Sequence, residues 1–162
     1  MQDLGSMAQS VAAKLVNRGE TVSVSESSGG GLISAALLSI PGASAYFMGG
    51  GVIYTPDARH KLLGVPAEAM TGLRSSTEPY ARLLAVRMNE ILSTTWTLSE
   101  TGASGPTGNS YGDRPGHSCI AVIGPVEQTM TLETEKDNRV ANMWMFAETA
   151  LDLLEKCIDA SG

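Results

Sequence analysis

Hydrophobic residues recur along the chain with two different periods, and these periods predict its secondary structure. Spacing of three to four residues, with capping residues at the ends, predicts helices over residues 3–18, 30–39, 55–63, 77–92 and 138–158. Runs rich in β-branched residues, bounded by glycine or proline, predict strands over residues 21–25, 45–54, 95–100, 117–123 and 127–133. In the first helix, for example, Asp3 is placed to cap the start and Gly19 to end the helix.

The order of these elements predicts the fold class. Strands alternate with helices along most of the chain, which is typical of an α/β protein. The last two strands flank Gly124-Pro125 and should form a hairpin, so one edge of the sheet is expected to be antiparallel. We therefore predict a three-layer α/β/α sandwich with a mostly parallel sheet and an antiparallel edge. No linker or repeat divides the sequence, which predicts a single domain over residues 1–162.

Composition and charge narrow the function classes. Of the 162 residues, 43% are hydrophobic and 17% are charged, the balance of a globular protein. The net charge of −6 argues against a broad electrostatic surface for nucleic acid. No apolar run is long enough to span a membrane and the N-terminus lacks the features of a signal peptide, so we expect a cytoplasmic protein with no membrane partner. Cys119 and Cys157 lack metal-ligand spacing and are predicted to be buried, reduced thiols.

The most informative segment is the turn that follows the first predicted strand. Residues 26–31 are Glu-Ser-Ser-Gly-Gly-Gly and lead directly into an apolar helical run. A strand, a glycine turn and a helix start direct backbone N–H groups, and the positive end of the helix dipole, at a small anion. A serine in the same turn is placed to attack such a ligand. The segment predicts a phosphate cradle, a nucleophile, or both; the plainer alternative is a capped helix start whose glycines serve packing alone.

Two further segments should reach the same edge of the sheet, where open α/β sheets bind ligands. One runs from Tyr54 to Arg59, at a strand end that leads into a helix. The other is the loop at residues 101–109, whose small and hydroxyl-bearing residues permit close approach of the backbone. The alternatives are a plain strand end at Tyr54, a solvated Arg59 and a surface turn, although long loops in compact domains are often functional.

The residues at the glycine turn resemble a family signature. Residues 25–31, Ser-Glu-Ser-Ser-Gly-Gly-Gly, are similar to the Ala-Glu-Ser-Cys-Thr-Gly-Gly motif of the CinA C-terminal domain family. The similarity continues in order through residues 41–47, 50–54, 62–65, 76–79, 101–106 and 137–139. Characterised members of that family are nicotinamide mononucleotide (NMN) deamidases. Full-length members carry a large N-terminal domain with no counterpart in this sequence, so the resemblance implies a stand-alone form.

The resemblance implies hydrolysis of the NMN carboxamide to nicotinate mononucleotide and ammonia, without a metal or cofactor. The family's nucleophile falls on Ser27, its tyrosine on Tyr54 and its lysine position on Arg59. The ligand-binding positions expected here are Glu26, Ser28, Gly29, Gly30, Gly31, Thr101, Ser104 and Arg139. The expected partner is a small nucleotide, NMN or a related molecule. Because the family often associates, a homo-oligomer is a further expectation.

Arg59 departs from the family pattern at a position that matters for the chemistry. A lysine with a lowered pKa can take the proton of a serine hydroxyl, whereas arginine stays protonated and cannot. Arg59 could instead orient a phosphate or stabilise an oxyanion. Lys61 lies two residues further on and, at about 100° per helical residue, should point away from the site. His60 and His117 are the other candidate bases.

The remaining departures alter the pocket without removing it. The family's Cys and Thr after the nucleophile are Ser28 and Gly29 here, and an arginine of the last helix is replaced by Met143. The leading hypothesis is therefore an NMN amidohydrolase. The main alternative is a paralogue that binds nucleotides and has lost the chemistry, acting as a binding or regulatory module. A third is an enzyme for another amide or phosphorylated substrate.

Overall fold

The computed structural model describes residues 3–162 and contains one five-stranded sheet. Residues 1 and 2, which belong to the segment where the sequence predicts no signal peptide, lie outside the described residues. The strands follow the order β2-β1-β3-β4-β5 across the sheet. Their bounds are β1 Val22–Glu26, β2 Phe47–Val52, β3 Trp96–Ala103, β4 His117–Ile123 and β5 Gln128–Glu133.

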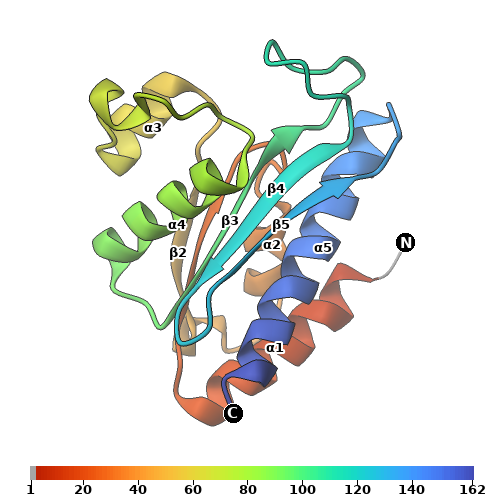
Figure 1. Cartoon of the computed structure of the whole chain (residues 1–162). Helices are drawn as coiled ribbons and strands as arrows, with labels where there is room; N and C mark the ends of the chain where they lie inside the picture. The colour runs from red at the N-terminus through yellow and green to blue at the C-terminus, as the bar shows by residue number, and fades with distance from the viewer. Residues whose placement is uncertain (1–2) are drawn as a thin grey trace.

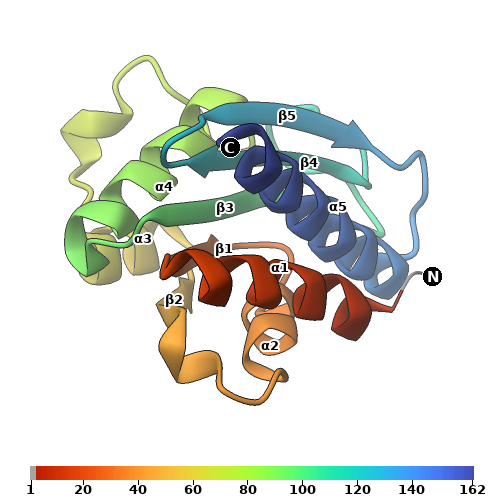
Figure 2. The same cartoon turned by 90° about the horizontal axis from the view of Figure 1, so that it is seen from below.

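Helices cover both faces of this sheet (Figures 1 and 2). The helices are α1 Leu4–Arg18, α2 Leu32–Leu38, α3 Pro56–Leu63, α4 Glu78–Leu92 and α5 Arg139–Ala160, with short 3-10 turns at Ala43–Ala45 and Ala67–Met70. In Figure 1, α3 and α4 lie on one side of the sheet and α1 and α5 on the other. Helix α2 packs against α1 and α5, and α4 packs on β1, β3 and β4. The predicted α/β/α sandwich is therefore confirmed.

The directions of the strands agree with the predicted sheet. Strand β1 lies between β2 and β3 and is parallel to both. Strand β4 is antiparallel to β3, and β5 is antiparallel to β4. The register pairs Ser25 of β1 with Ser99 of β3, so that Glu26 and Glu100, one residue further along, come side by side at the carboxyl end of the sheet. All five residues of β1 are buried, as expected for a central strand covered on both faces.

The sequence signals place most element ends correctly, and the exceptions are few. Strand β2 is two residues shorter at each end than the predicted strand at 45–54, because residues 43–45 form a 3-10 turn before it. Asp3 and Thr55 cap α1 and α3 through their side chains, as predicted. Helix α2 begins at Leu32 rather than near residue 30, because the glycines form a separate turn before it. Strand β3 continues through Ala103, three residues beyond the predicted end, since it pairs with β4 as far as His117. The predicted loop is correspondingly shorter.

Two main apolar clusters fill the space on either side of the sheet. The larger cluster joins α1, α2 and α5 to the sheet and includes Leu15, Leu98 and Leu154, all with no exposed surface. The smaller cluster lies beneath α3 and α4, around Leu63 and Leu84. Both cysteines are buried and unbridged, as predicted. Within residues 3–162, no helix is long and apolar enough to cross a membrane.

Strand β2 contains three consecutive glycines, and the central one is required by close packing. A Cβ atom added to Gly50 would lie 2.6 Å from the carbonyl oxygen of Val24 and 3.1 Å from the Oγ of Ser34. The first of these contacts is with backbone, which cannot move aside without distorting β1. At neighbouring Gly51 an added Cβ would meet only side-chain carbons, at 3.4 Å and beyond.

We expect Gly50→Ala to lower the free energy of unfolding by about 1–3 kcal/mol, the usual cost of an overpacked site. Gly51→Ala is the matched control. It should change stability by less than about 1 kcal/mol, because the methyl group fits and the unfolded chain loses freedom. Urea unfolding of the two variants beside the parent protein measures both values. Equal stability of the two variants would contradict the close approach of β2 to β1.

Candidate functional site

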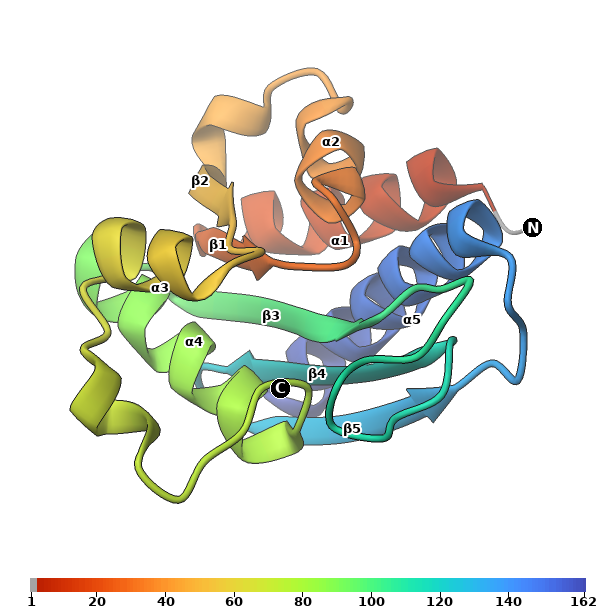
Figure 3. The ribbon, with the colours of Figure 1, turned by 90° about the horizontal axis from the view of Figure 1, so that it is seen from above.

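The turn after β1, the start of α3 and the loop between β3 and β4 gather at the carboxyl edge of the sheet, which Figure 3 views from above. Two adjoining cavities open between them. The first, here named the Ser27 pocket, has a volume of about 260 Å³. The second, the Ser28 pocket, measures about 210 Å³. They share Tyr54, Gly102 and Asn109 in their linings, so they form one elongated site with two compartments.

Seven of the residues singled out in the sequence line these cavities. The Ser27 pocket is lined by Ser27, Tyr54, Arg59 and Thr101. The Ser28 pocket is lined by Ser28, Tyr54, Ser104 and Arg139. Thr101 belongs to the end of β3, not to the loop in which the sequence placed it, yet it still borders the pocket. The three segments predicted to meet therefore do meet.

Glu26 does not face either cavity. Its side chain has no exposed surface and accepts hydrogen bonds from the backbone N–H groups of Gly31, Ile33 and Ser34, at 2.9–3.2 Å. These are the first N–H groups of α2, which otherwise lack partners at a helix start. Glu26 is thus an internal cap for α2, a correction to the expectation that it binds a ligand.

Glu100 is the principal group that the sequence analysis missed. It lies at the carboxyl end of the sheet, next to Glu26, and is completely buried. Its Oε2 accepts from the N–H groups of Ser27 and Gly29, at 3.1 and 2.7 Å. Its Oε1 accepts from the Oγ atoms of Ser28 and Ser118, at 2.6 and 3.2 Å. Burial raises the pKa of Glu100, and the hydrogen bonds from Ser28, Gly29 and Ser27 oppose that shift.

One signal for Glu100 was present in the sequence. It ends a predicted strand just as Glu26 follows another, so two carboxylates were expected at one sheet edge if the two strands are neighbours. Whether two strands are neighbours in the sheet depends on residues far apart in the sequence, and the local spacing of residues does not indicate it.

The two carboxylates change the interpretation of the glycine turn. The N–H of Gly29 donates to Glu100, that of Gly31 donates to Glu26, and that of Gly30 donates to the carbonyl of Ser27. The amides expected to line a nucleotide site are therefore directed at groups of the protein itself. The acceptor at the start of α2 is a side chain of the protein itself, Glu26, which corrects the prediction of a phosphate cradle made by these three glycines.

Arg59 lies half-buried in the wall of the Ser27 pocket. Its Nη1 is 3.5 Å from the hydroxyl of Tyr80, and its guanidinium carbon lies 5.8 Å from the centre of that ring. Its Nε is buried and has no hydrogen-bond partner among the described residues. Arg59 is therefore a fixed cation at the pocket, not a solvated helix residue, and it retains donors for a ligand.

None of the alternative bases is placed to serve Ser27. Lys61 is exposed and forms an ion pair with Asp57, 2.7 Å away on the same helix. His60 is exposed and does not line the Ser27 pocket. His117 is buried, and its ring nitrogens contact Glu133 and the carbonyl of Ser76. Although burial alone would lower the pKa of His117, those two contacts raise it, which favours a charged, structural imidazole.

Arg139 supplies a second cation, at the Ser28 pocket. It is the first residue of α5, and its Nη1 donates to the carbonyl of Gly105, 2.5 Å away. Its Nη2 donates to the hydroxyl of Tyr54 at 3.3 Å. These contacts hold the guanidinium over the cavity, where the buried hydroxyl of Ser104 has no partner among the described residues.

The loop between β3 and β4 is held against the rest of the site by an ion pair. Arg74, which precedes α4, makes two hydrogen bonds to Asp113, at 2.7 and 3.0 Å. The hydrogen bond from Arg74 also holds the pKa of Asp113 below its usual value. Asn109 closes the turn internally by accepting from the N–H groups of Tyr111 and Asp113. Asn109 and Tyr111 are thereby fixed at the Ser27 pocket.

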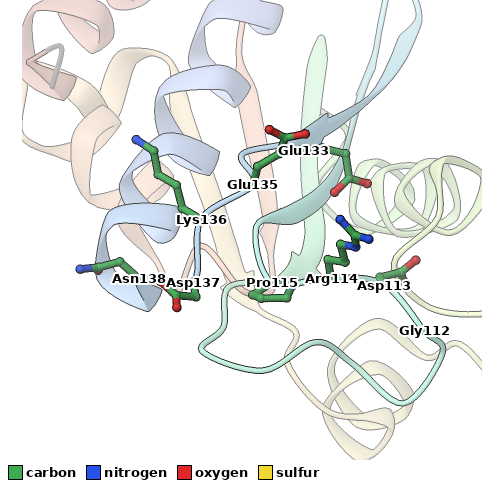
Figure 4. A pocket seen from close by; sticks show the side chains of 9 residues that line it. All are labelled: Gly112, Asp113, Arg114, Pro115, Glu133, Glu135, Lys136, Asp137 and Asn138. Carbon is green, nitrogen blue, oxygen red and sulfur yellow. The ribbon is translucent and has the colours of Figure 1, made fainter.

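A larger hollow of about 930 Å³ lies elsewhere, between the loop at residues 112–115 and the segment at residues 133–138. In Figure 4, Arg114 and Glu133 point toward one another, while Lys136 and Asn138 point away. No predicted site residue lines this hollow, and its lining contains no serine or cysteine. Among residues 3–162, no group of three or more His, Cys, Asp or Glu side chains is arranged to hold a metal ion.

Comparisons with known proteins agree with this architecture. A structure of a CinA superfamily protein from Klebsiella pneumoniae 700603 superposes with a TM-score of 0.92 at 21% identity, covering 98% of this chain and 99% of that one. The competence/damage inducible protein CihA from Agrobacterium tumefaciens superposes with a TM-score of 0.89 at 27% identity, covering 97% and 96%. At 21% identity, the similarity to the Klebsiella protein shows a shared fold and nothing more.

Comparison of sequences identifies the family to which the chain belongs. A CinA-like protein of Gloeobacter violaceus is 36% identical over 157 residues, which is 95% of this chain and 37% of that protein. One from Synechocystis is 34% identical over 163 residues, 99% of this chain and 39% of that protein. The chain thus spans less than two-fifths of the length of these curated relatives. The model of the CinA C-terminal domain matches residues 4–158, and the chain belongs to the CinA C-terminal domain family.

Proposed function

We propose that the two adjoining pockets bind a pyridine nucleotide, NMN or a close relative, and that a serine hydroxyl of the turn at residues 27–28 hydrolyses its carboxamide. One observation carries the proposal: Ser27, Tyr54 and Arg59 border one cavity, and Ser28 and Arg139 border the next. A mononucleotide has a flat ring at one end and a phosphate at the other. An elongated site with two compartments suits such a ligand.

Electrostatics support an anionic nucleotide as the ligand. The chain carries a net charge of −6, so attraction must come from local groups. Arg59 and Arg139 lie one in each compartment, and a guanidinium can bind a phosphate through two parallel hydrogen bonds. Tyr54 borders both pockets and brings an aromatic ring that suits a cationic pyridinium.

The chemistry requires a nucleophile, a proton acceptor and a group that stabilises the oxyanion. The family resemblance assigns the attack to Ser27, which lies half-exposed at the Ser27 pocket. Attack on the carboxamide carbon gives a tetrahedral oxyanion, and Arg59 can stabilise that negative charge as a fixed cation. Loss of ammonia leaves an acyl-serine, and water then releases nicotinate mononucleotide.

The second candidate function is a binding or regulatory module that holds the same nucleotide without hydrolysing it. Arg59 favours it, because an arginine cannot accept the proton of Ser27. In the part of the chain that the structure describes, the Oγ of Ser27 has no hydrogen-bond partner, and Lys61 is paired with Asp57. This module should bind NMN in calorimetry with no ammonia formed, and Arg59→Lys should then introduce ammonia release.

We expect the protein to release ammonia from NMN at a rate far above that of a double variant, Ser27→Ala with Ser28→Ala. Removing both hydroxyls of the turn should lower kcat/KM by at least about 10³-fold, as loss of a nucleophile does. A coupled assay for ammonia, with chromatography of nicotinate mononucleotide, measures the difference. Ser6→Ala, at an exposed serine in α1, is the matched control and should leave the rate unchanged. Equal rates for the parent and the double variant would exclude hydrolysis at this turn.

A single phosphate occupies one of the two compartments, so we expect either Arg59 or Arg139 to recognise it. One of the two variants Arg59→Ala and Arg139→Ala should therefore weaken NMN binding by about 10- to 100-fold, since charge-assisted hydrogen bonds contribute roughly 1.5–3 kcal/mol. That variant should bind the corresponding nucleoside, which lacks the phosphate, as well as the parent protein does. Arg82→Ala is the control, because Arg82 is exposed and pairs with Glu127 away from the site. If nucleotide and nucleoside lose affinity equally, the arginines do not contact the phosphate.

A further inference from the structure

The two serines of the turn differ in what surrounds their hydroxyl groups. Among the described residues, nothing accepts a hydrogen bond from the Oγ of Ser27. The Oγ of Ser28 donates to the Oε1 of Glu100 over 2.6 Å, a short contact typical of a hydroxyl on a charged acceptor. A hydroxyl attacks an amide only if a neighbouring group takes its proton. By this criterion Ser28, not Ser27, has its proton acceptor already in place.

The hydrogen bonds around Glu100 suit the form that can accept a proton. Its two oxygens lie within hydrogen-bond distance of four donor groups, the hydroxyls of Ser28 and Ser118 and the N–H groups of Ser27 and Gly29. An ionised carboxylate can accept all four of these hydrogen bonds. The backbone of the turn also approaches Glu100 closely, since the N–H of Gly29 lies 2.7 Å from the Oε2 and a Cβ added to Gly29 would lie only 3.0 Å from it. Glu100 is therefore fixed relative to Ser28.

Ser28 belongs to the wall of a cavity that a cation also lines. Ser28 lines the Ser28 pocket although only 4% of its surface is exposed. Arg139 lines the same pocket and is held there by Gly105 and Tyr54. Two hydrogen bonds leave further N–H donors of its guanidinium for an oxyanion. Nucleophile and stabilising charge thus line one compartment, and the acceptor lies directly behind the nucleophile, hydrogen-bonded to it.

We propose that Ser28 is the nucleophile of this chain and Glu100 its general base. The proposal rests on the proposed function for the class of substrate, a nucleotide carboxamide. It places the attack on Ser28 in place of the position that the family resemblance indicates. It also supplies the proton acceptor that Arg59 cannot provide.

The reaction balances with these groups alone. The Oγ of Ser28 forms a bond to the carboxamide carbon as its proton passes to Glu100, and Arg139 stabilises the oxyanion. Collapse breaks the C–N bond, and the proton on Glu100 goes to the leaving nitrogen, which departs as ammonia. Water then attacks the acyl-serine and gives a proton to Glu100, which returns it to Ser28. Burial raises the pKa of Glu100, which makes its carboxylate a stronger base.

A fluorophosphonate probe tests the pair without reference to NMN, because it reacts with activated serine hydroxyls. After incubation of the folded protein, tandem mass spectrometry of the peptide containing both serines locates the adduct. We expect the adduct on Ser28, retained in Ser27→Ala and absent in Ser28→Ala. Glu100→Gln should slow labelling by at least about 10²-fold, the usual contribution of general base catalysis. Glu127→Gln, at an exposed carboxylate, is the matched control and should label normally.

An adduct on Ser27, no adduct on the folded parent protein, or unchanged labelling of Ser28 in Glu100→Gln would each overturn the proposal. Because Glu100→Gln changes a buried group, its thermal unfolding is compared with that of the parent. A second variant, in which Glu100 is unchanged, tests whether a reagent can reach position 28. The thiol introduced by Ser28→Cys should be alkylated by iodoacetamide under native conditions, while buried Cys119 and Cys157 stay unmodified. Protection of that thiol would show that no electrophile reaches the position.

The outcome separates this proposal from the proposed function. If the probe labels Ser28 in a way that depends on Glu100 but NMN releases no ammonia, the assignment of Ser28 and Glu100 stands and NMN is not the substrate. If Ser28→Ala still releases ammonia from NMN, NMN is the substrate and Ser28 with Glu100 is not the catalytic pair.

Discussion

Two buried carboxylates, Glu26 and Glu100, determine how the site around the glycine turn is built. Neither has exposed surface, and a buried ionised carboxylate costs several kcal/mol unless hydrogen bonds replace its water. The backbone between residues 27 and 34 supplies most of those hydrogen bonds, with hydroxyls of Ser28 and Ser118 completing the set. The parallel pairing of β1 with β3 brings the two side chains together. The turn therefore folds around its own anions.

This arrangement decides which groups remain for a ligand. In many α/β proteins the first N–H groups of the helix after β1 bind a phosphate. Here Glu26 occupies them, so an anionic ligand must be recognised by side chains, and Arg59 and Arg139 are the cations that line the two cavities. The same internal pairing fixes the turn rigidly. Ser27 and Ser28 consequently face their respective pockets from a backbone that has little freedom to move.

The elements and their order could be predicted from local signals, because caps and periodicity act over a few residues. Asp3 and Thr55 are examples, since each side chain caps the helix that follows it. The meeting of three segments at one sheet edge also followed from the expected topology. The groups that accept hydrogen bonds from the turn could not be predicted in this way. Whether an N–H of the turn faces a ligand or a buried side chain depends on a strand more than seventy residues away. Glu100 was overlooked for that reason, and Glu26 was misplaced on the ligand side.

The departures from the family motif at positions 28, 29 and 59 make physical sense together with Glu100. A threonine at position 29 would place its Cβ 3.0 Å from Glu100 and 3.3 Å from Glu26, so a buried carboxylate at position 100 favours glycine there. At position 28, a hydroxyl is a stronger hydrogen-bond donor to a carboxylate than a thiol is. At position 59, a lysine base is unnecessary if Glu100 accepts the proton, as we propose. A fixed guanidinium at position 59 can then bind or stabilise negative charge without taking part in proton transfer. With Glu100 as the base that we propose, the presence of Arg59 alone does not make the site inactive.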